Sequence, residues 1–249
     1  PQKVPHSLHF GCRYHHALTD LLAYVAVPAG SSTTNMLNRN IGSLENYGVE
    51  FNIAAKPIVT NDFTWTLSYN VGWNHNEITE LTTGASQLKT GGISGGNGNT
   101  VQIHAEGHPA SSFYLFQQVY DESGAPLEGV YVDQNGDGQI DDSDKIINKS
   151  PDPKVTMTFG SQFRYKKWDL GFNIRASIGN YVYNNVLSTK AVYNDLFTYG
   201  LNNVVENDYY FEQPRYMSDY YLRNASFVRC DNITLGYTWD NLLNDKLRL

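Results

Sequence analysis

A run of oxygen-bearing side chains in residues 131–145 has a spacing that metal chemistry would explain. Asp133, Asn135, Asp137 and Asp144 occupy the first, third, fifth and last positions of a calcium-type loop, and Gln139 falls where a backbone carbonyl is required. Gly138 stands at the position of the sharp turn. A hard cation prefers such oxygen ligands, so the pattern predicts a structural Ca²⁺ site at Asp133, Asn135, Asp137, Gln139 and Asp144.

The same segment has a second interpretation. Asp144 replaces the glutamate of an EF-hand loop and has a shorter reach, and prolines flank the segment where helices would be expected. A plain Asn/Asp/Gly turn that binds nothing is the alternative. These carboxylates lie on one polar loop without a histidine or an apolar pocket beside them, so we predict no catalytic residue and no enzyme.

Composition limits the class of protein. Tyr, Phe and Trp number 18, 11 and 4 in 249 residues, although the mean hydropathy is only -0.44, a mixture suited to strands with one apolar and one polar face. The net charge of -7 argues against a nucleic-acid surface. No apolar run reaches the roughly 20 residues of a membrane helix, but strands of a membrane barrel need only about 10 alternating residues.

Long alternating segments on both sides of the loop would position it. Residues 63–73 set Phe, Trp, Leu, Tyr, Val and Trp against Thr, Ser, Asn and Gly, and segments 40–57, 155–165 and 168–178 alternate in the same way. About eleven such residues, tilted by about 40°, cross the apolar layer of a membrane. We therefore expect Trp65, Leu67, Tyr69, Phe159, Phe172 and Ile174 to face lipid.

The remaining segments complete the outline. Alternation in residues 7–16 places Leu8, Phe10, Cys12 and Tyr14 on one face, and segments 19–28 and 226–239 are also expected to be strands. Another strand is expected to begin at the KLRL sequence of residues 246–249, which brings the total to about eight. Residues 82–100 predict a mobile loop, and residues 183–214 a large outer loop whose aromatic side chains either stack on sugars or pack internally.

Several phrases together resemble one family. They are NIGSLENYGVEFNI with FTWTLSYNVGWNHNEITEL, then EGHPASSFY, YVDQNGDGQIDDSDK, WDLGFNIRASIGNYVYN and YLRNASFVRCDNITLGYTW. Their order resembles the C-terminal part of the SusC/RagA-type TonB-dependent outer-membrane transporters.

This resemblance implies an all-β fold, an antiparallel transmembrane β-barrel of which residues 1–249 form part of one domain, without the plug. It also implies uptake of oligosaccharides or peptides across the cell outer membrane, with a SusD-like surface lipoprotein, TonB and outer-membrane lipid as partners. The alternative from the residues alone is a secreted, calcium-stabilised β-sandwich binding module or adhesin. Strands of eleven or twelve residues would favour the barrel, since sandwich strands average about five or six.

Overall fold

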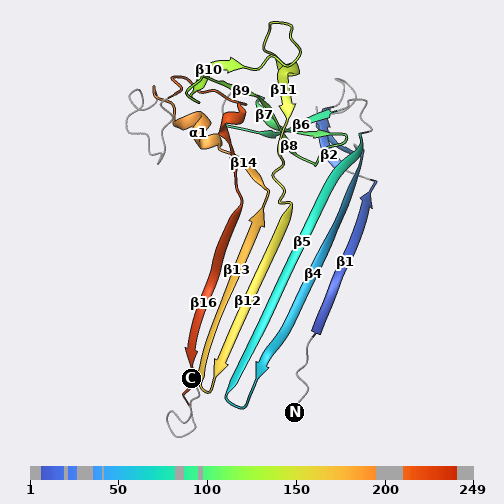
Figure 1. The fold of residues 1–249 in the computed structure, drawn as a ribbon. Helices are drawn as coiled ribbons and strands as arrows, with labels where there is room; N and C mark the ends of the chain where they lie inside the picture. The colour runs from blue at the N-terminus through green and yellow to red at the C-terminus, as the bar shows by residue number, and fades with distance from the viewer. Residues whose placement is uncertain are drawn as a thin grey trace.

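One tall antiparallel sheet dominates the structure (Figure 1). The computed structural model describes residues 7–19, 22–26, 36–40, 42–81, 87–94, 98–194 and 210–239. Its main sheet has six strands in the order β1-β4-β5-β12-β13-β16, so each strand pairs with the next one of the sheet along the chain. The strands are β1 Ser7–Leu18, β4 Gly42–Val59, β5 Phe63–Leu81, β12 Val155–Tyr165, β13 Trp168–Ile178 and β16 Phe227–Tyr237.

The register aligns the alternating rows across the sheet. Phe159 of β12 stands opposite Tyr69 of β5 and Ile174 of β13. Ser161 stands in the same way between Leu67 and Phe172. Because side chains alternate with a period of two, this register gathers the apolar rows on one face and the Thr, Ser, Asn and Gly rows on the other.

The apolar face of the sheet has no cover in the described part of the chain. Figure 1 shows no second layer over the long strands, and Ile233 and Leu235 of β16 are each 70% exposed. A β-sandwich would bury this face against a second sheet. The β-sandwich alternative is therefore wrong for the described residues.

The two ends of the sheet differ. Short turns join β4 to β5 and β12 to β13 at one end, the second of them at Lys166 and Lys167. Three long connections leave the other end and form a loop layer there (Figure 1). They carry β2 Leu22–Ala26 and β3 Met36–Asn40; β6 Gln87–Gly92, β7 Thr100–Ala105, β8 Ser112–Phe116, β9 Gln118–Tyr120, β10 Pro126–Tyr131, η1 Asp142–Asp144 and β11 Lys145–Ile147; and β14 Tyr181–Tyr183, α1 Asn185–Lys190, η2 Asp219–Tyr221 and β15 Leu222–Asn224.

The loop layer has its own core. The β5–β12 connection and the β13–β16 connection both contribute to it. The buried members of this core are Val101, Phe113, Leu115, Tyr183, Leu187, Ala191, Val192, Phe211 and Tyr221. The backbone N–H of Phe116 also donates to the carbonyl of Met217 at 2.8 Å. Two segments far apart in sequence thus form one packed body.

The predicted all-β, antiparallel fold is confirmed, with a different number of long strands among the described residues. In segment 19–28, expected to be a strand, the described residues 22–26 form the short strand β2, which pairs with β3 in the first connection instead of joining the main sheet. The strand expected near residues 246–249 lies outside the described residues. Where residues 82–100 predict a loop, β6 forms and pairs with β7. In the described part, no helix is both long and apolar enough to span a bilayer.

Candidate functional site

The calcium-type loop lies at the outer end of the loop layer, between β10 and β11 (Figure 1). Asp133 organises its first half: one carboxylate oxygen accepts the N–H of Gly136 at 2.7 Å and the other that of Gly138 at 2.8 Å. Gly138 has φ of +78°, the conformation expected at the sharp turn. The N–H of Gly138, followed by that of Gly136, holds the pKa of Asp133 below its usual value.

The other predicted ligands also bind loop backbone. The side-chain oxygen of Asn135 accepts the N–H of Asp137 at 2.9 Å, and Asp137 accepts that of Gln139 at 2.8 Å. Asp144 is fully buried, and its two oxygens accept the N–H groups of Gln134 at 2.9 Å and Asp141 at 2.8 Å. The residue predicted as the last ligand therefore serves as one half of a capping box on η1.

These contacts bear on metal binding. All the side chains offer hard oxygen donors, and a carboxylate oxygen that accepts one N–H still has a free lone pair. Among the described residues, however, no three His, Cys, Asp or Glu side chains are placed together to hold a metal ion. The donor types fit Ca²⁺, and the three aspartates do not converge on a common point.

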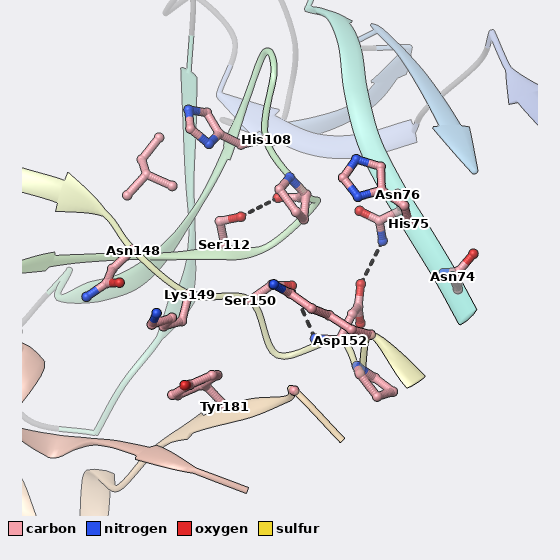
Figure 2. A pocket seen from close by; sticks show the side chains of 15 residues that line it. Asn74, His75, Asn76, His108, Ser112, Asn148, Lys149, Ser150, Asp152 and Tyr181 are labelled. Atoms are coloured by element: carbon pink, nitrogen blue, oxygen red, sulfur yellow. Dashed lines mark hydrogen bonds between the residues drawn. The ribbon is translucent and has the colours of Figure 1, made fainter. Parts of the chain in front are cut away.

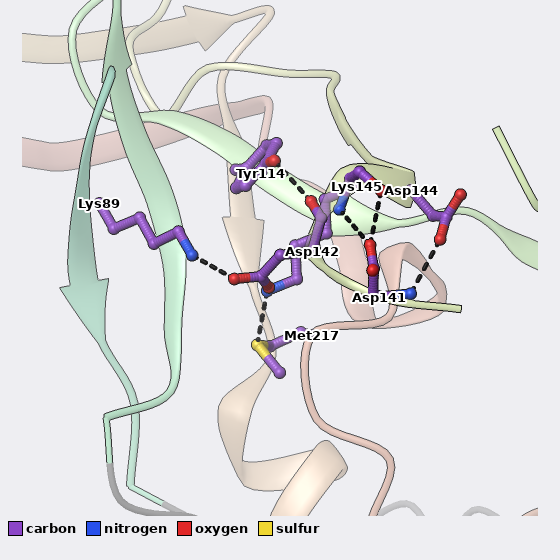
Figure 3. Close-up of polar contacts among 8 residues, drawn as sticks. Lys89, Tyr114, Asp141, Asp142, Asp144, Lys145 and Met217 are labelled. Atoms are coloured by element: carbon purple, nitrogen blue, oxygen red, sulfur yellow. Dashed lines mark hydrogen bonds and ion pairs between the residues drawn. The ribbon is translucent and has the colours of Figure 1, made fainter. Parts of the chain in front are cut away.

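An ion bridge that the sequence pattern did not indicate fastens the loop (Figure 3). The Lys145 ammonium lies 2.6 Å from one oxygen of Asp142, and Lys89 of β6 contacts the other oxygen. The Lys145 side chain is only 4% exposed and lies over the ring of Phe116, 5.0 Å from its centroid. Hydrogen bonds from Lys145 and then Lys89 lower the pKa of Asp142 to about 2.

A polar cavity of about 360 Å³ lies where the sheet meets the loop layer (Figure 2). Asn76 of β5 donates to Asp152 at 2.6 Å across it and accepts the N–H of Ala110 at 2.9 Å. Lys149 lies over the ring of Tyr181, 5.4 Å from its centroid. The cavity has the size of a small-molecule site, although its walls are more polar than usual.

The polar face of the main sheet carries shallow grooves. One of about 280 Å³ has uncharged walls that include Thr66, Gln162 and Asn173, and another of about 500 Å³ nearer the short turns adds Lys56, Arg164 and Asp169. Gly160 leaves the space that the Ser68 and Asn173 side chains occupy, because a Cβ there would stand 2.5 Å from Ser68 Oγ and 2.7 Å from Asn173 Oδ1. The face can offer many hydroxyl and amide groups to a passing polar molecule.

The aromatic residues of the outer loop divide between the two expected roles. Phe211 is fully buried, which confirms packing, whereas Tyr193 is 47% and Tyr210 38% exposed. Tyr199 and Tyr209, which were also expected here, lie outside the described residues. Exposed Tyr193 and Tyr210 therefore remain the candidates for contact with a ligand.

Comparisons with known proteins agree with this architecture. No family model matches the chain. TonB-dependent receptor SusC of Bacteroides thetaiotaomicron is 50% identical over 242 residues, 92% of this chain and 24% of that receptor. TonB-dependent receptor P3 of Formosa agariphila is 30% identical over 88% of this chain and 24% of that protein. The chain thus spans about a quarter of the length of these relatives.

Solved structures show the same fold. The structure of the RagAB peptide transporter matches with a TM-score of 0.69 at 22% identity, over 94% of this chain and 27% of that chain. These relatives are named receptors and transporters, which agrees with the expectation of a non-enzymatic protein. The sequence motifs, the six-stranded sheet and these similarities lead to one conclusion: the chain belongs to the SusC/RagA-type TonB-dependent receptors of the outer membrane and forms part of their β-barrel.

Proposed function

We propose that the chain forms one side of the wall of an energised importer that brings oligosaccharides or peptides across the outer membrane. The observation that carries this proposal is the division of the sheet into an uncovered apolar face and a hydrogen-bonding polar face. A membrane barrel needs the first toward lipid and the second toward a wet interior.

Aromatic side chains at both ends of the apolar face support this orientation. Near the short turns, Trp65 stacks on Phe163 at 5.7 Å, and Trp168 contacts Tyr237 at 4.7 Å. Near the loop layer, the Tyr47 and Trp73 rings lie 5.8 Å apart. Aromatic side chains favour the two interfaces of a bilayer, so the apolar rows between these bands would lie in the hydrocarbon layer.

The loop layer would receive a SusD-like surface lipoprotein, and TonB would act through a part of the receptor outside this chain. Its shared core makes the layer a firm platform, and Tyr120, Leu127 and Val130 in β9 and β10 are 48%, 40% and 44% exposed. Large exposed apolar side chains favour protein contacts.

The test uses the complete receptor in its own outer membrane. Uptake of labelled oligosaccharides and of labelled peptides is measured in cells with the receptor, without it, and with the receptor but without TonB. Uptake of one class that needs both the receptor and TonB supports the proposal and identifies the substrate. Uptake that is unchanged without the receptor, or extraction of the receptor without detergent, contradicts it.

We also propose that the loop of residues 131–145 takes up one structural Ca²⁺ through Asp133, Asn135, Asp137, Asp144 and the carbonyl of Gln139. The oxygen donors and the lowered pKa of Asp133 support it, because that carboxylate stays ionised. Binding would require Asp133, Asp137 and Asp144 to move together, because among the described residues no three such side chains are placed to hold an ion. An extracellular loop needs only weak affinity, with Kd of about 10⁻⁴ to 10⁻³ M, because calcium is abundant there.

A further inference from the structure

Two arginines face each other on the polar side of the sheet, close to the loop layer. Arg175 of β13 is the register partner of Arg229 of β16. Nε of Arg175 lies 3.4 Å, and Nε of Arg229 3.1 Å, from different oxygens of Asp231. The ring of Phe227 lies beside both guanidinium groups, with its centroid 5.7 Å from Arg175 Cζ and 5.5 Å from Arg229 Cζ.

A bulge in β16 makes this arrangement possible. The register passes from Asn173 opposite Asn232 to Ile174 opposite Cys230, so Asp231 is the extra residue. In a strand without a bulge, neighbouring residues point to opposite faces, so Asp231 would point away from the face that carries Asn232. Bulges re-aim side chains in this way and are frequent beside functional sites.

The charges of this group do not balance. Like charges directly opposite each other on neighbouring strands are destabilising, and one carboxylate between two guanidinium groups leaves one positive charge. The side chains of Arg175, Arg229 and Asp231 are 45%, 60% and 39% exposed, so an arriving molecule can reach them. A guanidinium over an aromatic ring keeps N–H donors at its edge for a carboxylate.

We propose that Arg175, Arg229 and Phe227 form a subsite for a carboxylate carried by the imported substrate. The arriving carboxylate displaces Asp231 from one or both arginines, and Phe227 contacts the apolar part of the substrate beside it. This inference rests on the proposed function, because it requires the polar face to line the transport path. Either an uronic-acid oligosaccharide or the free carboxyl end of a peptide supplies this chemistry.

The test measures binding to the complete receptor, purified in detergent, with two matched pairs of probes. One pair is tetragalacturonic acid and its methyl ester, and the other is a tetrapeptide and its C-terminal amide. In the pair that binds, we expect the carboxylate form to bind more tightly to the unchanged receptor. Arg175→Gln and Arg229→Gln should weaken that form on the order of tenfold or more and leave its neutral partner unchanged.

Asp231→Asn gives the decisive contrast, because it keeps both arginines and removes their internal competitor. A substrate subsite predicts tighter binding of the carboxylate probe, with no change for the neutral one. Weaker or unchanged binding of the carboxylate form, equal effects on both members of a pair, or no preference for either carboxylate overturns the inference. Import of neutral substrates by the unchanged receptor would show that the proposed function survives such a result.

Discussion

Trp65 donates its indole N–H to the hydroxyl of Ser161 at 2.9 Å on the apolar face of the sheet. Ser161 is the polar member of an otherwise apolar row and is 5% exposed. Burial of a hydroxyl without a partner costs free energy, more so in lipid, and this bond removes the cost. The level at which Leu67, Ser161 and Phe172 stand side by side can therefore lie inside a membrane.

The lipid-facing orientation is tested at that level. Leu67→Arg or Phe172→Arg should lower the free energy of unfolding of the complete receptor by about 2 to 4 kcal/mol, because a charge at mid-membrane is costly. Gln162→Arg on the polar face, opposite the uncharged residues Thr66 and Gly171, is the matched control and should cost much less. Unfolding in denaturant in lipid vesicles measures all three, and equal stability of the two lipid-face variants with the parent would rule the orientation out.

The two ion pairs of Asp142, with Lys145 and with Lys89, should contribute unequally to the stability of the calcium-type loop. Asp142→Asn leaves the buried ammonium of Lys145 without its ion partner and should destabilise the loop by about 1 to 3 kcal/mol. Lys89→Gln removes a half-exposed partner and should cost no more than about 1 kcal/mol. Hydrogen exchange of residues 131–147 measures both, and equal protection in the two variants would contradict the role given to Lys145.

The same bridge predicts acid sensitivity of the loop. The pKa of Asp142 falls from 3.8 to about 2 on folding, so its contribution is complete above about pH 4 and is lost as the pH falls through about 2. Protease-accessible opening of residues 131–147 should rise over this range in the parent. Asp142→Asn should lack this part of the pH dependence, and an identical profile would show that another group is responsible.

Calcium occupancy predicts protection against proteases. Cleavage of the complete receptor in chelator should begin within residues 131–145, and added Ca²⁺ should slow it with a midpoint of about 10⁻⁴ to 10⁻³ M. Asp133→Ala should abolish the calcium effect, whereas Asp121→Ala, in a turn outside the loop, should keep it. Equal cleavage with and without calcium would leave the segment as a hydrogen-bonded turn.

The shared core of the loop layer predicts a large local effect of Phe211. Its ring is fully buried against Tyr220, with centroids 5.0 Å apart, so Phe211→Ala should destabilise the layer by about 3 to 5 kcal/mol. Tyr193→Ala should cost little, since that side chain is 47% exposed and its N–H bond to the Phe211 carbonyl remains. Hydrogen exchange in β8 and α1 measures the difference, and unchanged exchange in Phe211→Ala would contradict a common core.

Strict alternation made the central strands predictable. In β5, β12 and β13, the expected rows of residues 63–73, 155–165 and 168–178 lie on the expected faces, because no irregularity interrupts the pairing of β12 with either neighbour. In β1 the prediction was wrong for Cys12 and Tyr14. A register shift between His9 and Cys12 places them opposite Glu50 and Gly48, on the polar face. A single-residue bulge carries no signal in side-chain periodicity.

The ion pairs that hold the calcium-type loop could not be predicted from the sequence either, and the reason is different. Lys89 and Asp142 are 53 residues apart, and their contact depends on the pairing of β6, β7, β8 and β11 in one sheet of the loop layer. The spacing of Asp133 to Asp144 predicted calcium ligands, which stays a prediction. It did not show that backbone N–H groups would occupy both oxygens of Asp144, since a capping box and a cation loop use the same aspartate.

The divided core of the loop layer has a consequence for biogenesis. Val101, Phe113 and Leu115 precede the β12–β13 hairpin in the chain, whereas Tyr183, Phe211 and Tyr221 follow it. If the loop layer faces the cell exterior, as proposed, the two halves cannot meet there until that hairpin has returned the chain to the same side of the membrane. A receptor stalled between the two connections would therefore display one half of this core without its apolar partner.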